Sequence, residues 1–311
     1  MKNLLFTLLF ITSNITAQEV VQQKTIKTTT GKSYVRTITT TSSPDRFEFT
    51  EVYEDGFLSR KGYLSSYNPF KQVGEEVSFY RSGNIKLKQY KNGKESVGKR
   101  TAYYDNGTIR EEGEYLKPSN SEFLDYPEYL VSQISDSLGN NLLDKSGSGK
   151  VNLTFANGDI LRGEYKNGKK EGEFYELYKE KEETYIENYL DGIFISGVFT
   201  DKAGKKNSYE KKAVFPSFKG GNTAFYSWLS SQLSYPTNMR RQNIQGKVLV
   251  SFYIDKDGKL QSPTIRKGIV NGDELEQEAL RVMEKSPKWN PGLFRGKAVR
   301  VNYSVPIIFK L

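Results

Sequence analysis

The chain of 311 residues contains no cysteine and no histidine. Without these residues it cannot form disulfides, bind a metal through thiolate or imidazole, or use a cysteine nucleophile or a histidine-based triad. Two carboxylates could still hydrolyse a glycoside, but no spacing of Asp and Glu picks out such a pair. We therefore expect a protein that is not an enzyme, requires no cofactor and binds no metal.

Long apolar runs are also missing, and the longest one, residues 4–11, is well short of the ~20 residues that span a bilayer. Lys2 precedes this run, and small and polar residues follow it up to Ala17. This order is typical of a secretory signal peptide, which predicts that residues 1–18 are removed on export. The alternative is an uncleaved segment that anchors the protein in the membrane. For an exported protein we expect no nucleic-acid partner.

Aromatic residues and glycines are plentiful, and they recur at a fixed spacing. A Gly, Tyr, Gly series that starts at Gly74 returns 24 residues later at Gly98, a third copy covers residues 155–168, and a looser fourth covers residues 172–192. Tyr, Phe and Val alternate with Lys and Glu, and Asn-Gly and Asp-Gly pairs separate the segments, which favours strands joined by two-residue hairpin turns. Residues 47–213 are therefore predicted to form an all-β array of hairpins whose stacking completes a core.

Two segments do not follow the repeat. Residues 19–46 are rich in Thr and are predicted to form one or two short strands. An insert at about 117–150 is predicted to contain a short helix. Its apolar residues fall at helical spacing: Tyr129, Leu130, Ile134 and Leu138.

The array resembles the MORN-type repeats of many secreted bacterial proteins. The resemblance implies the fold more than the function, although MORN repeats have been proposed to bind lipids or proteins. The other interpretation is a scaffold or spacer in which Tyr and Gly serve packing and turns.

A domain boundary is predicted near residue 214, after the polar segment 202–212 and before Pro216. We expect a helix capped by Thr223 that ends before Pro236, because the residue preceding a proline is pushed out of helical geometry. Strands are expected over residues 248–254 and 260–266, with a hairpin turn at Asp257-Gly258. A second helix is expected behind a capping box of Asp273 and Glu276. Its inward residues should be Leu275, Ala279, Val282 and Met283.

The last strand shows the clearest pattern in the chain. Apolar residues occupy the odd positions from Val299 to Leu311, and the even positions are mostly small or polar. One face of the strand is therefore predicted to be buried and the other to be exposed to solvent. Pro306 cannot donate a hydrogen bond to a neighbouring strand, which predicts an edge strand. Such an edge is a template for the addition of another chain's strand.

A set of spaced positions covers about residues 216–311: Gly220, Gly221, Tyr235, Pro236, Gly246, Gly258, Glu278, Arg281, Pro287, Trp289 and Pro291. At these positions the domain closely resembles the TonB C-terminal domain in the form common among Bacteroidetes. The resemblance implies an α+β fold with two helices on one side of a small antiparallel sheet.

The resemblance also implies a periplasmic role in which the domain binds the TonB box, a short peptide of an outer-membrane transporter. The box adds as a strand to the last strand, mainly through main-chain hydrogen bonds. The peptide-binding segment is Arg300 to Lys310. The residues expected to take part are Arg300, Val301, Asn302, Tyr303, Ser304, Val305, Ile307 and Ile308.

The chain departs from a full energy transducer in its N-terminal half. A signal peptide stands where the family has a membrane helix, and a β-repeat array stands where it has a Pro-rich spacer. Direct transmission of proton-motive force is therefore in doubt, whereas peptide binding is not. The alternative function is an envelope scaffold or adaptor. In such an adaptor the repeats bind cell wall, lipid or protein, and the C-terminal domain serves only as a docking module or forms a homodimer through its last strand.

The chain has a formal charge of +9, and this charge is unevenly placed. Residues 216–311 hold 15 Lys or Arg against 7 Asp or Glu, whereas the first 215 residues are nearly neutral. The surplus on the C-terminal domain predicts attraction to an acidic envelope partner or surface.

Overall fold

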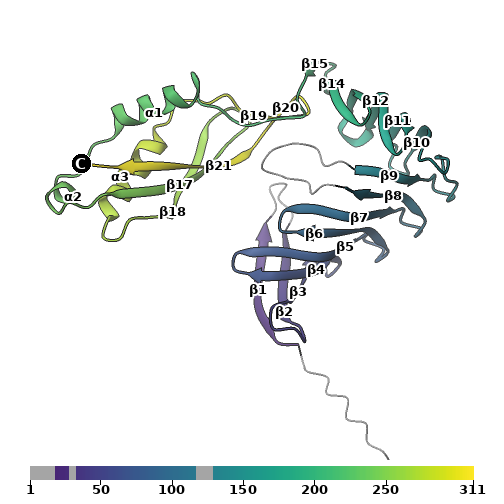
Figure 1. Ribbon diagram of the computed structural model, residues 1–311, viewed down its shortest axis with the longest axis horizontal. Coiled ribbons are helices and arrows are strands. Elements are labelled where there is room, and N and C mark those ends of the chain that lie inside the picture. The colour runs from purple at the N-terminus through teal and green to yellow at the C-terminus, as the bar shows by residue number, and fades with distance from the viewer. Residues whose placement is uncertain (1–17, 28–32, 117–128) are drawn as a thin grey trace, which may run out of the picture. The chain divides into compact units, whose positions relative to one another are not determined.

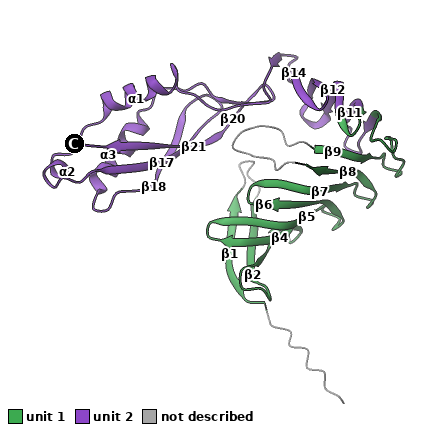
Figure 2. Ribbon diagram, in the orientation of Figure 1, with its two compact units in different colours: residues 1–151, 165–169 green, residues 152–164, 170–311 purple. Residues whose placement is uncertain are grey.

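A computed structural model of the chain describes residues 18–27, 33–116 and 129–311. The expected signal peptide and residues 117–128 of the insert lie outside these ranges. Contacts divide the chain into two compact units, residues 1–151 with 165–169, and residues 152–164 with 170–311 (Figure 2). The boundary near residue 214 falls inside the second unit and stays a prediction.

The first unit is built on a nine-stranded antiparallel sheet whose strands follow one another in chain order (Figure 1). The first two strands occupy the Thr-rich segment, as expected. The strands are β1 (Val20–Lys27), β2 (Ser33–Thr40), β3 (Phe47–Tyr53), β4 (Leu58–Tyr67), β5 (Phe70–Phe79), β6 (Ile85–Asn92), β7 (Glu95–Tyr103), β8 (Ile109–Tyr115) and β9 (Tyr129–Ile134).

The helix expected from Tyr129 to Leu138 was a wrong prediction. Tyr129–Ile134 forms strand β9, which pairs with β8 and places Tyr129 opposite Tyr115. Leu138 is exposed in the turn that follows. The apolar spacing fits a helix equally well, but a short helix is only marginally stable on its own, whereas a strand here gains main-chain hydrogen bonds to the free edge of β8.

The glycine pairs form two kinds of turn. Asn167-Gly168 and Asp191-Gly192 are two-residue loops with positive φ at both residues, as predicted. Asn106-Gly107 instead closes a three-residue loop, in which the Gly107 N–H donates to the Tyr104 carbonyl and the Tyr104 N–H donates to the carbonyl of Thr108. This is a turn followed by a left-handed glycine, so the two-residue prediction was wrong for this class.

The repeated tyrosines join one hairpin to the next. The Tyr80 hydroxyl donates to the carbonyl of Tyr103 at 2.7 Å, and the Tyr104 hydroxyl donates to the carbonyl of Ser135 at 2.8 Å. The 24-residue recurrence therefore has a structural cause in the first unit, because each copy repeats the same contact.

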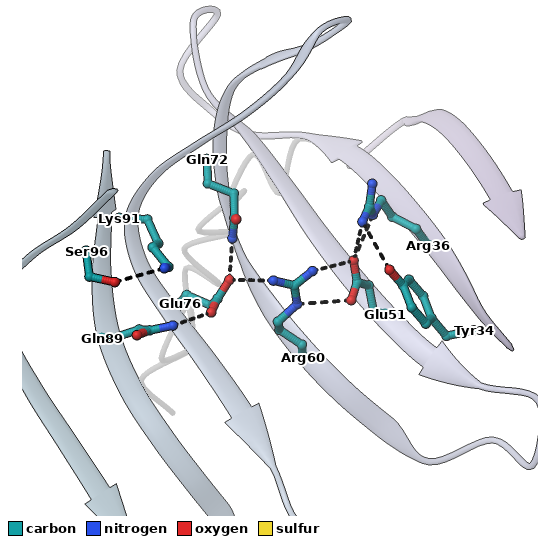
Figure 3. Close-up of polar contacts among 9 residues, drawn as sticks. All are labelled: Tyr34, Arg36, Glu51, Arg60, Gln72, Glu76, Gln89, Lys91 and Ser96. Carbon is teal, nitrogen blue, oxygen red and sulfur yellow. Dashed lines mark hydrogen bonds and ion pairs between the residues drawn. The ribbon is translucent and has the colours of Figure 1, made fainter. Parts of the chain in front are cut away.

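A row of alternating charges crosses strands β2 to β5 (Figure 3). Glu51 accepts from Arg36 at 2.6 Å and from Arg60 at 2.8 Å, and Arg60 also donates to Glu76 at 2.8 Å. Glu76 accepts further hydrogen bonds from two glutamine amides, those of Gln72 and Gln89. Both glutamates are buried, so the opposite charges compensate the cost of burying each carboxylate.

Six further strands form a second antiparallel sheet in chain order. They are β10 (Gly149–Thr154), β11 (Ile160–Lys166), β12 (Lys169–Tyr178), β13 (Glu183–Leu190), β14 (Ile193–Thr200) and β15 (Lys206–Tyr209), with a short 3-10 helix, η1 (Lys179–Lys181), between β12 and β13. The two sheets bear out the expectation of a mostly antiparallel β structure.

The C-terminal region contains two small sheets and the helices. One sheet has the order β16-β19-β20 and the other β18-β17-β21. The elements are β16 (Ala213–Val214), α1 (Gly221–Gln232), α2 (Thr237–Arg241), β17 (Gly246–Ile254), β18 (Leu260–Lys267), α3 (Asp273–Glu284), β19 (Gly292–Phe294), β20 (Lys297–Val299) and β21 (Val301–Phe309). Within the described ranges, no helix combines the length and the apolar character needed to cross a bilayer.

One core joins the helices to the sheet β18-β17-β21. It contains Phe225 and Leu229 of α1, the alternate residues of β17 from Val248 to Ile254, and Val305, Ile307 and Phe309 of β21. The four inward residues expected on α3 are all buried there. Both helices therefore pack against the same face of the sheet, because their apolar stripes share one cluster.

The helix starts differ from those expected. Helix α1 begins at Gly221 with Gly220 at the cap, so Thr223 lies inside the first turn. Helix α3 is capped by Gly272 without a side-chain hydrogen bond, so Asp273 is not a capping residue. Glu276 instead accepts from the Ile269 N–H at 3.0 Å. Here loop geometry preceding each helix outweighs the local capping signal.

The β19–β20 turn contacts the second repeat sheet within the second unit. Arg295 donates to Glu187 at 2.7 Å and to Glu176 at 2.8 Å. Glu187 also accepts from the hydroxyls of Tyr189 and Tyr209, both at 2.6 Å. This cluster ties the hairpin that precedes β21 to strands β12 and β13.

Candidate functional site

Strand β21 lies at the edge of its sheet and pairs with β17 alone among the described strands (Figure 1). The pairing is antiparallel and runs without a register shift from Gly246 opposite Phe309 to Ile254 opposite Val301. The other side of β21 is therefore a straight row of main-chain groups with no strand partner in the described ranges.

The two faces of β21 alternate as the sequence predicted. Val305, Ile307 and Phe309 are buried, whereas Asn302 and Ser304 are exposed. Ile308 is 67% exposed, which is high for a large apolar residue. Among the expected peptide-binding residues, Tyr303, Val305 and Ile307 pack into the core and Val301 is half-buried, so their side chains do not face the free edge.

The long final strand is interrupted, which corrects one prediction. Val299 belongs to β20 and pairs with Gly292 of β19, whereas β21 begins only at Val301. Arg300 lies between the two strands. Two different neighbours, β19 and β17, pair with this segment, so the chain passes from one sheet to the other at Arg300.

The opposite edge of the sheet, strand β18, is irregular. Its pairing with β17 has two register shifts. Ser262 has a positive φ of 49°, and Pro263 follows it without an N–H. Bulges and prolines are features that block strand addition at an edge. Only the β21 edge of this sheet is straight enough to extend.

Trp289 is the centre of the aromatic packing beneath the sheet. Its side chain is buried, and its ring lies 5.7 Å from the rings of both Phe252 and Tyr303. The indole N–H donates to Ser286 Oγ at 2.9 Å, and the Trp289 main-chain N–H donates to the carbonyl of Gly258 at 2.8 Å. Trp289 therefore couples the β17–β18 turn to the inner face of β21.

Tyr235 packs at the far end of β21. Its ring contacts Phe309 edge to face at 5.9 Å, and its hydroxyl donates to the carbonyl of Ile244 at 2.5 Å. The contact holds the end of the strand against the segment that leads into β17.

Glu278 and Arg281 act on the end of α1. Glu278 accepts from the Ser234 N–H at 2.6 Å, and Arg281 donates to the carbonyl of Gln232 at 2.9 Å. Arg281 also donates to Glu278, and this hydrogen bond lowers the pKa of the Glu278 carboxyl below its ordinary value. Arg281 thus satisfies a carbonyl that the helix end leaves without a partner, and Glu278 satisfies the N–H of the residue after the cap.

The remaining matched residues shape turns and element ends. Gly220 and Gly221 both have positive φ at the start of α1. Pro236 caps α2, Gly246 begins β17, and the prolines at 287 and 291 flank Trp289. The matched positions therefore build the domain, and the edge of β21 is a consequence of their packing.

Sequence reasoning missed the residues of β17 that face the same side as the even positions of β21. Ser251 Oγ and Ser304 Oγ are 2.8 Å apart. The Arg300 guanidinium lies 3.3 Å from the centre of the Tyr253 ring. No local signal could have paired them, because the partners are about fifty positions apart in the chain.

In the described part of the chain, no group of three or more Asp and Glu residues is arranged to hold a metal ion. In the C-terminal domain the shifted pKa values belong to ion pairs and to carboxylates in turns. Burial would raise the pKa of Asp255, but hydrogen bonds from the main-chain N–H groups of Lys259 and Asp257 outweigh it and lower the pKa below its ordinary value. The arrangement offers main-chain donors and acceptors to a partner.

The C-terminal domain is thus a three-stranded sheet that is covered by helices on one face and has one straight free edge among the described strands. Residues 231–311 match the family model of the Gram-negative bacterial TonB protein C-terminal. This match assigns the C-terminal region to a domain of that type and supports a TonB-family protein. None of the curated proteins matches the chain. The match confirms the coarse resemblance, whereas the Bacteroidetes form and the MORN repeats stay predictions.

Proposed function

We propose that the protein is an exported TonB-family binding protein whose C-terminal domain takes up a strand-forming peptide of an outer-membrane transporter. The peptide adds to β21 and thereby supports TonB-dependent transport in the periplasm. The protein acts without catalysis and without a cofactor.

The contrast between the two sheet edges carries this proposal. β21 has nine consecutive residues in register with β17, whereas the pairing of β18 with β17 has two register shifts. Strand addition needs a straight run of free N–H and C=O groups, since each hydrogen bond depends on the register of the one before.

Pro306 indicates which residues present these groups. A proline in a strand is tolerated where its missing N–H faces no partner. The even positions of β21 therefore point their main chain away from β17. Asn302, Ser304 and Ile308 supply donors, and Pro306 supplies a carbonyl only.

The alternative, an adaptor that dimerises through β21, uses the same edge and excludes the peptide. The charge row of the first unit is paired within itself, so it gives the adaptor no specific support. Sedimentation of the full chain separates the two functions. A tight dimer that leaves β21 protected from exchange favours the adaptor.

The proposal is tested by titrating TonB-box peptides of outer-membrane receptors into the isotopically labelled full chain. We expect the largest amide shifts along residues 299–309 and small shifts along β18. The absence of shifts across a panel of such peptides would refute the proposal.

A matched pair of modified peptides tests the mode of binding. One carries N-methyl groups on one set of alternate residues, and the other carries them on the remaining set. Only one set of peptide N–H groups can face β21, so we expect one modified peptide to lose binding and the other to keep it. Equal affinity of both would show that side chains, not the main chain, are recognised.

A further inference from the structure

The sheet β18-β17-β21 has an open face on the side away from α1 and α3, whose buried side chains join the core on the other face. The residues of β17 that alternate with the buried ones point to the open face. Lys267 of β18 and Pro306 of β21 both lie opposite Leu249. Ile308 of β21 lies opposite Lys247. These cross-strand pairs place the five side chains on one side of the sheet.

Three of these side chains form an apolar group on the open face. Ile308 is mostly exposed, and Leu249 and Pro306 beside it are half-buried. The neighbouring row across the same face is polar, with Ser251 in contact with Ser304. An exposed isoleucine that continues into two further apolar residues is a feature of interaction surfaces.

Three lysines surround the apolar group. Lys247 and Lys267 each lie opposite one of its members. Lys310 follows Ile308 by two positions, so the alternation of the strand places it on the same side. All three lysines are exposed.

No carboxylate belongs to the strands of the open face, all of which the structure describes. β17, β18 and β21 contain no Asp or Glu. The seven acidic residues after residue 215 lie at 255–257 or on α3, which packs against the other face. A fourth cation, Arg300, lies at the far end of the open face, with its guanidinium 3.3 Å from the centre of the Tyr253 ring. The open face therefore has a positive potential that the sheet itself does not neutralise.

The residue types on the open face favour a lipid surface as the partner. Interfaces between proteins are depleted in Lys and use Arg in fixed, bidentate geometry, whereas most of the cations here are lysines and the arginine is stacked on a ring. A polyanion in solution would use the lysines but would give the exposed Ile308 no role. The surface of an anionic bilayer attracts lysines and takes up apolar side chains at the same time.

We infer that the open face binds the surface of an anionic phospholipid bilayer. The Ile308 side chain enters the boundary between headgroups and acyl chains, and the lysine ammonium groups lie near the phosphates. Strand pairing uses hydrogen bonds in the plane of the sheet, so the free edge of β21 points along the membrane and stays open to a peptide. The inference goes beyond the proposed function and does not depend on it.

The absence of cysteine from the chain allows a single fluorescent label to be placed on this face. Ser304→Cys carries an environment-sensitive fluorophore on the open face, and Ser227→Cys carries it on α1 as the matched position. The labelled full chain is titrated at low salt with equimolar phosphatidylglycerol and phosphatidylcholine vesicles. We expect emission to rise for the open-face label only, less in high salt and not with phosphatidylcholine alone. Binding through another part of the chain leaves this label in water.

Lys247→Gln and Lys267→Gln, each added to the Ser304→Cys chain, should each lower the affinity for the anionic vesicles about five-fold. Ile308→Ser should lower it by a similar factor, because an apolar side chain no longer enters the bilayer surface. Lys285→Gln removes the same charge from the end of α3, on the other side of the sheet, and is the control. It should leave the affinity nearly unchanged.

An equal response to neutral and anionic vesicles, a response of the α1 label alone, or full affinity of both lysine variants would each overturn the inference. Equally tight binding of polyglutamate in solution, unaffected by Ile308→Ser, would also overturn it, because that result assigns the open face to an acidic polymer. The peptide titration of β21 is read independently of all these results, so the two proposals can fail separately.

Discussion

Glu187 shows how one residue is stabilised in an ionised form inside the second unit. Burial of this carboxylate would raise its pKa, because it is only 1% exposed. The charges of Lys212 and Arg295, with the two tyrosine hydroxyls, outweigh burial and lower the pKa from its ordinary 4.5 to about 2. Since the folded pKa is the lower one, this group stabilises the fold above pH 4.5, and that stabilisation is lost as the pH falls towards 2.

Glu187→Gln should therefore reduce the free energy of unfolding at pH 7 by about 3 kcal/mol, because it leaves two buried cations short of a partner. At pH 3 the difference from the wild type should shrink by about 2 kcal/mol, since the wild-type carboxylate has begun to lose its advantage. Urea unfolding at both pH values measures this. Glu173→Gln is the control, as Glu173 is exposed on β12. An equal loss at both pH values would contradict the assigned ionisation.

At the scale of elements, turns of the same type differ in how closely the rest of the protein packs against them. Gly204 and Gly258 both close three-residue loops with positive φ, 79° and 80°. A Cβ on Gly204 would meet nothing within 4 Å, whereas one on Gly258 would lie 2.1 Å from the Trp289 carbonyl oxygen. The β17–β18 turn is therefore packed against the Trp289 segment, and the turn before β15 is not.

Gly204→Ala should cost about 1 kcal/mol, the strain of a left-handed alanine. Gly258→Ala should cost roughly 3 kcal/mol, since it adds a main-chain clash that displaces Trp289. Urea unfolding followed by tryptophan emission compares the two variants, and only Gly258→Ala should also change the emission of the folded protein. Similar costs for both would show that the contact with Trp289 is unimportant.

At the scale of the whole molecule, the C-terminal domain is joined to the repeats by more than the chain connection. Within the second unit Arg295 contacts Glu187 and Glu176, and Lys297 donates to Glu183 at 2.6 Å. Only Arg300 separates β20 from β21. A force on a peptide bound to β21 would therefore reach this ion cluster through a short covalent path.

Arg295→Gln should weaken the contact between the β19–β20 turn and the second repeat sheet and leave the sheet β18-β17-β21 folded. We expect hydrogen exchange of the full chain to rise about ten-fold or more over residues 292–299 and around Glu187, with protection of β17 retained. Arg266→Gln is the control, because Arg266 is exposed on β18. Unchanged exchange at residues 292–299 would mean that the cluster does not hold the hairpin.

Much of the C-terminal domain could be predicted from local pattern. The alternation of β21, the inward face of α3 and the Asp257-Gly258 turn all follow from spacing within a few residues. Two of the errors have a shared cause. Tyr129–Ile134 became a strand and Val299 joined a different sheet, because in each case another strand, β8 or β19, offered hydrogen bonds.

By itself the sequence determined the main strands and helices of the C-terminal domain that have one apolar face, where most turns occur, and that the positive charge gathers after residue 215. These properties depend on side chains near each other along the chain. Only the tertiary structure decided that β21 and not β18 has the straight free edge, that Arg300 lies over Tyr253, and that Arg295 meets Glu187. These depend on pairings between residues about fifty to one hundred positions apart, for which local spacing carries no information.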